Sequence, residues 1–72
     1  MSAGVPPYVR LANEIAAQFA HRSASEAATA IANHMKAVWD PRMKQALIDH
    51  ANSGATGLDP AAVLAARKLQ GL

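Results

Sequence analysis

The sequence predicts an all-α protein, a small bundle of three to four short helices with no strands. Apolar residues recur every three or four positions along most of the chain, and each such run begins at a proline or at a residue that caps helices. Alternating apolar and polar runs, which indicate strands, are absent. At 72 residues the chain has room for one small helical domain, expected over residues 1–72. Its expected elements are an extended segment over 1–6 and helices over approximately 7–21, 24–38, 41–52 and 60–70.

The first two helices have recognisable start signals. Pro6 and Pro7 fix φ near the helical value, which suits a first turn. Ser23 and Glu26 have the spacing of a capping box, in which each side chain bonds the other residue's backbone N–H. The buried face of the first helix is expected to hold Tyr8, Ala12, Ile15 and Phe19, and that of the second Ala27, Ile31, Met35 and Val38.

The last two helices each begin at an Asp-Pro step. The aspartate can cap the helix, and the proline at the first helical position loses no needed hydrogen bond. The step also ends the second helix near Trp39, because the residue before a proline is disfavoured in the α region. The expected apolar faces are Met43, Leu47 and Ala51, flanked by Ala46 and His50, and then Val63, Leu64 and Leu69. Leu58 and Val63 have hydrophobic-staple spacing, and Gly54 and Gly71 are expected to end the two helices.

The composition points to a chain that needs support from a partner. Hydrophobic residues make up 51% of it, but many are alanine and only 4% are aromatic, so little apolar surface is available for a core. Small chains in this position usually rely on disulfides, metals or association, and this one has no cysteine. The missing cysteine and the absence of a signal-peptide pattern or a long apolar run favour the cytoplasm and argue against a membrane.

Catalysis and metal binding have no support in the residue pattern. His21, His34 and His50 are far apart and lack the spacing of metal ligands, and the glycines of "SGATG" lack the strand and lysine of a phosphate loop. We therefore expect no catalytic, cofactor or metal residues in this chain. A formal charge of +2 is also too small for a typical nucleic-acid binder, although Lys36, Arg42 and Lys44 leave that alternative open.

A protein contact is a better reading of the segment "KAVWDPRMK" at Lys36–Lys44. It holds the only tryptophan beside an arginine and a methionine, and Met35 directly precedes it; these residue types are enriched in protein interfaces. Trp39 has two open readings, which are compatible: it packs into the corner of its own bundle with one edge of the indole, or it presents an edge to a partner. The predicted partner interface is Met35, Trp39, Asp40, Pro41, Arg42 and Met43.

Three stretches carry a family resemblance: "RLANEIAAQFA" at Arg10–Ala20, "EAATAIANHMKAVWDPRM" at Glu26–Met43 and "LIDHANSGATGLDPAAVLA" at Leu47–Ala65. In this order and spacing the chain resembles the delta subunit of soluble NAD-dependent molybdenum formate dehydrogenases. The most specific piece is "IANHMKAVWDPRM" joined to the downstream "GLDP". The chain departs from the family pattern at the termini and around His21–Ser25.

The resemblance implies a non-catalytic accessory subunit of a cytoplasmic hetero-oligomer. In that family the alpha subunit carries bis-molybdopterin guanine dinucleotide and iron–sulfur clusters, the beta subunit carries FMN and the NAD site, and the gamma subunit carries a further cluster. This chain is expected to hold no cofactor and to dock on the alpha subunit. Arg42 would pair with a partner carboxylate or carbonyl, Trp39 would anchor the contact, and Asp40 would cap the helix. The alternative is a transient assembly factor that aids insertion of the molybdenum cofactor.

Overall fold

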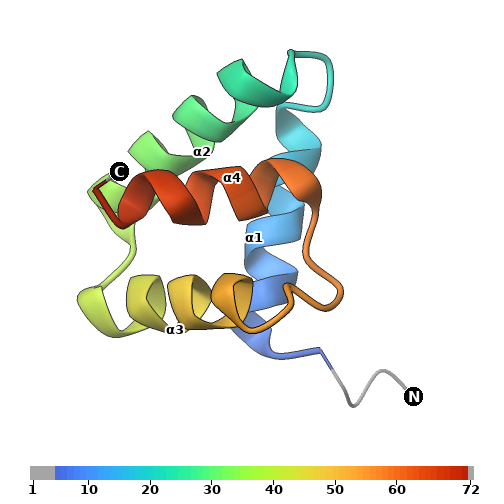
Figure 1. Ribbon diagram of the computed structural model, residues 1–72. Helices are drawn as coiled ribbons and strands as arrows, with labels where there is room; N and C mark the ends of the chain where they lie inside the picture. The colour runs from blue at the N-terminus through green and yellow to red at the C-terminus, as the bar shows by residue number, and fades with distance from the viewer. Residues whose placement is uncertain (1–4, 72) are drawn as a thin grey trace.

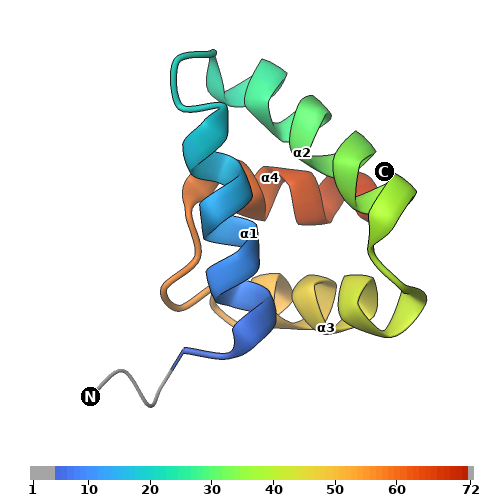
Figure 2. The ribbon, with the colours of Figure 1, turned by 180° about the vertical axis from the view of Figure 1, so that it is seen from behind.

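A computed structural model describes residues 5–71, and four α-helices span that part of the chain. They are α1 Pro7–Gln18, α2 Ala24–Val38, α3 Pro41–Asn52 and α4 Pro60–Leu69. α4 packs against each of the other three helices and lies between α2 and α3 (Figure 1). Seen from behind, α1 passes in front of α4 (Figure 2). Residues 5–71 contain no strand, which confirms the all-α prediction.

The predicted caps form at the starts of α2, α3 and α4. Ser23 Oγ accepts the Glu26 N–H at 3.2 Å, and Asp40 Oδ1 accepts the Met43 N–H at 2.9 Å. Asp59 Oδ1 accepts the Ala61 N–H at 2.9 Å. Each bond satisfies a backbone donor that the first turn of a helix leaves free. Within residues 5–71 the capping box at Ser23 is one-sided, because the bond from the Ser23 N–H to Glu26 is not formed.

α1 is shorter than the expected 7–21. It ends at Gln18, and Phe19 leaves the helical region with φ −112° and ψ 16°. Beyond it the backbone bonds tighten to a three-residue spacing, since the Arg22 N–H donates to Phe19 O. This tight turn directs the chain into the Ser23 cap of α2. Of the expected extended segment 1–6, residues 1–4 lie outside the described part, and Pro6 is extended with ψ 151°.

Alanine forms much of the core, and this changes which helix faces are buried. The expected faces are only partly right. The alanines that are 3% exposed or less are Ala12, Ala16, Ala27, Ala28, Ala32, Ala62, Ala65 and Ala66. The largest side chains that are fully buried are Val9, Ile31, Met35 and Leu47. Because the distance between packed helices follows the size of the contact residues, alanines on α2 and α4 allow these helices to lie close together.

The predicted core positions were wrong or only partly right on three of the helices. On α4 the alanines take the inner face, so Leu64 is 38% exposed while Val63 and Leu69 are half-buried. On α2 the buried line continues from Met35 to Trp39, which leaves Val38 63% exposed. On α1 Ala12 is fully buried as predicted, but Val9 is fully buried in place of its neighbour Tyr8, which is half-buried. On α1 and α4 the shift moves a larger side chain toward the edge of the helix contact, whereas on α2 it brings the larger Trp39 into the core.

Candidate partner interface

The corner between α2 and α3 is a fixed turn. We use "corner" for residues 38–43. The Trp39 N–H donates to Met35 O at 2.9 Å, which completes the last turn of α2. Trp39 and Asp40 are then extended, with ψ 139° and 164°, and Pro41 begins α3. The Asp40 side chain caps α3, so both sides of the turn are held by hydrogen bonds.

In the structure of the single chain, Trp39 packs into the core. Its side chain is 8% exposed and belongs to the core, beside Met35, which is 0% exposed. The indole therefore packs into the bundle of its own chain. Met35 has no surface to offer a partner, so these two residues can only position the corner from within.

The other predicted interface residues remain on the surface. Asp40, Pro41 and Arg42 are exposed and Met43 is half-buried. Val38, which the sequence placed in the core, joins them as an exposed apolar side chain. The sequence offered one signal of this exposure, which is that Val38 directly precedes Trp39 at the end of α2. When the tryptophan is buried, the side chain of its neighbour points to a different side of the helix. The surface of the corner thus combines apolar atoms with one free guanidinium.

A second ordered feature is the loop between α3 and α4, which residues from two helices hold in place. The Asn13 side chain of α1 donates to Gly57 O at 2.8 Å and accepts the Asp59 N–H at 2.8 Å. His50 Nε2 lies 2.7 Å from Thr56 O, and because a carbonyl only accepts, this nitrogen carries the proton. The His50 ring also packs edge to face against the Tyr8 ring, with the two ring centroids 5.9 Å apart.

Sequence reasoning missed the part that Asn13 plays. Its partners lie 44 and 46 residues further along the chain, and an asparagine within a helical run carries no signal of such contacts. The turn itself was easier to predict. Gly54 and Gly57 adopt φ angles of 114° and 74°, a region that glycine enters without steric cost.

The comparison with protein families identifies the chain. Residues 8–66 match the family described as NADH-dependent formate dehydrogenase delta subunit FdsD. The chain belongs to this family. It is therefore a subunit of an NAD-dependent formate dehydrogenase, and the matched range includes the whole corner and the loop that Asn13 holds. No curated protein and no solved structure matched the chain.

The residues of this delta subunit do not fit an iron–sulfur cluster, one of the groups that the formate dehydrogenase resemblance implies for its complex. Iron–sulfur clusters are held mainly by cysteine thiolates, and the chain has no cysteine. Among residues 5–71 no group of three or more His, Asp or Glu could hold a metal ion. None of the four helices in this range is long and apolar enough to cross a membrane.

Proposed function

We propose that this delta subunit is a non-catalytic accessory subunit that stabilises a cytoplasmic molybdenum formate dehydrogenase. It docks on the alpha subunit, and the beta and gamma subunits belong to the same complex. The observation that carries the proposal is the family match over residues 8–66. In this scheme formate oxidation and NAD reduction take place in the other subunits, which hold the molybdenum cofactor, the clusters and FMN.

The side chains of the chain support a role without catalysis. Of the three histidines, His50 holds the loop between α3 and α4 through its hydrogen bond to Thr56 O, while His21 and His34 are exposed. The carboxylates of Asp40 and Asp59 cap helices. His50, Asp40 and Asp59 therefore each have a structural task in the described part of the chain.

The small core supports a role in assembly. Much of the buried apolar surface comes from alanine, and each alanine removes less area from water than a leucine or isoleucine would. A partner that binds only the folded chain adds free energy of folding that grows with the ratio of partner concentration to Kd. Folding of this chain and assembly of the complex would then be linked.

The corner is the proposed docking surface. Val38 and Met43 supply apolar area, and Arg42 supplies a guanidinium with donors in a planar fork that fits a carboxylate. Asp40 and Pro41 fix the backbone between them, and Trp39 with Met35 supports the turn from the core. Such a rigid surface loses little conformational freedom when it binds.

Deletion of the chain tests the proposal. Formate dehydrogenase should be purified through a tag on the alpha subunit, from cells with and without this chain, and assayed for subunit content, melting temperature and formate-dependent NAD reduction. We expect near-stoichiometric delta subunit in the first preparation and reduced stability and activity in the second. Full activity, assembly and thermal stability without the chain would refute the proposal. Absence of the chain from an active mature complex that needs it during synthesis would instead support the assembly factor.

A further inference from the structure

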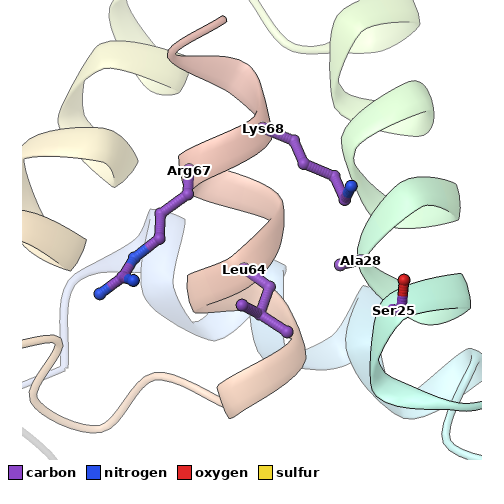
Figure 3. A pocket seen from close by; sticks show the side chains of 5 residues that line it. All are labelled: Ser25, Ala28, Leu64, Arg67 and Lys68. Carbon is purple, nitrogen blue, oxygen red and sulfur yellow. The ribbon is translucent and has the colours of Figure 1, made fainter. Parts of the chain in front are cut away.

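A groove between α2 and α4 lies outside the corner. Its volume is about 300 Å³, and it is lined by Ser25 and Ala28 of α2 and by Leu64, Arg67 and Lys68 of α4. In Figure 3 the Lys68 side chain extends from α4 toward Ala28 and Ser25, and Arg67 extends from the other side of α4. Leu64 precedes these two cations by three and four positions, about one helical turn, so it is a neighbour of both along the helix.

Folding of the isolated chain does not account for this combination. Cations in the last turn of a helix are favoured by the helix dipole, which explains charge at Arg67 and Lys68 but not an apolar residue beside them. Leu64 is 38% exposed because alanine fills the buried face of α4, so a large apolar side chain is left at the groove. None of the side-chain hydrogen bonds within residues 5–71 involves a lysine or an arginine.

We infer that the groove is a second docking site, which takes an acidic segment of another formate dehydrogenase subunit. One large apolar side chain of this segment packs on Leu64 and Ala28, and carboxylates beside it meet Arg67 and Lys68. The inference rests on the proposed function, because the segment belongs to the same complex. It adds a surface and a partner chemistry that the corner does not supply.

Charge complementarity selects this occupant. Two cations reach out on either side of the apolar surface, and Ser25 is the one other polar residue of the lining. A basic or purely apolar segment would leave both cations desolvated without partners, which is costly. One carboxylate of the segment fits the fork of Arg67 with two parallel hydrogen bonds, and another pairs with the ammonium of Lys68.

The test uses the assembled enzyme with the tagged alpha subunit. A carbodiimide joins an amine directly to a carboxylate, so it should couple Lys68 to an Asp or Glu of another subunit, identified by mass spectrometry. The variant R67Q/K68Q should be retained about tenfold less than wild type after a low-salt wash, which corresponds to about 1.4 kcal/mol. L64A should also lower retention, and the salt dependence of wild-type retention should be lost in R67Q/K68Q.

Matched controls separate this site from general effects of charge and exposure. R10Q/K36Q removes one arginine and one lysine that are exposed and belong to neither the groove nor the corner. L11A shortens a leucine that is 39% exposed on α1, against 38% for Leu64.

Retention of R67Q/K68Q and L64A equal to these controls would overturn the inference and leave the proposed function intact. Absence of the wild-type chain from the purified enzyme would overturn both. If a groove variant loses its helical circular dichroism, the cross-link from Lys68 in the wild-type chain becomes the test, because it needs no substitution. A cross-link to a carboxylate of another subunit supports the inference, and its absence overturns it.

Discussion

Asn13 Oδ1 accepts the backbone N–H of Asp59 at 2.8 Å, so the middle of α1 holds the residue that caps α4. The Asp59 carboxylate in turn accepts the Ala61 N–H. The first turn of α4 therefore depends on a side chain from the opposite end of the sequence. Because α4 packs against all three other helices, this contact fixes the helix on which the core depends.

Replacing Asn13 by alanine should lower the free energy of unfolding by about 1–2 kcal/mol. The change removes two hydrogen bonds, and each typical bond contributes about 1 kcal/mol net. Urea denaturation of the purified chain would measure the effect. Asn33→Ala is the matched control, because it makes the same change on the exposed side of α2. Equal stability of the two variants would show that Asn13 does not hold α4.

Replacing Asp40 by alanine should cost about 1 kcal/mol through loss of the α3 cap. Asp40→Ser keeps an oxygen that can accept the Met43 N–H, so it should recover most of the loss. Thermal melts followed by circular dichroism would compare the two. Equal melting temperatures for the alanine and serine variants would contradict a capping role.

The caps and turns could be predicted because their signals are local. Ser23, Asp40 and Asp59 lie two or three residues from the N–H groups that they accept. Gly54 shows the same principle, since its φ of 114° is rarely open to other residues. The predicted start of α3 and the corner followed from residues within one helical turn of each other.

The inner face of each helix could not be predicted as well, because it depends on which neighbour packs there. The rule that larger apolar residues are buried placed Leu64 and Val38 inside, and both are exposed. Close packing of α2 and α4 selects Ala28 and Ala65 instead, and periodicity does not distinguish these positions from other alanines. The groove beside Leu64 was missed for the same reason.

Enlarging Ala65 to leucine should destabilise the chain by about 1–3 kcal/mol. Ala65 is 0% exposed on α4, and extra methyl groups in a packed helix contact force the helices apart. Ala17→Leu on the exposed side of α1 is the control, which should change the stability by less than about 0.5 kcal/mol. Urea midpoints would show the difference. A stability gain at Ala65 would mean that space remains between the helices.

Replacing Trp39 by alanine should unfold much of the isolated chain. Deleting a buried tryptophan costs about 3–5 kcal/mol, whereas a chain of this size has a total stability of roughly 4–11 kcal/mol. Far-ultraviolet circular dichroism at increasing temperature would reveal a large fall in the melting point. Unchanged melting with lost binding to the alpha subunit would instead mean that the indole faces outward in solution.

Replacing Arg42 by alanine should weaken binding to the alpha subunit without changing the stability of the free chain. Arg42 is exposed in the first turn of α3, where the helix dipole does not favour a cation, so the free chain should keep its stability. Retention on the tagged alpha subunit should fall about tenfold if its guanidinium pairs with a carboxylate or carbonyl there. Arg10→Ala, on the exposed side of α1, is the matched control and should bind as wild type does. Equal retention of the two variants would remove Arg42 from the docking surface, while the folding role of Trp39 would stand on its own melt.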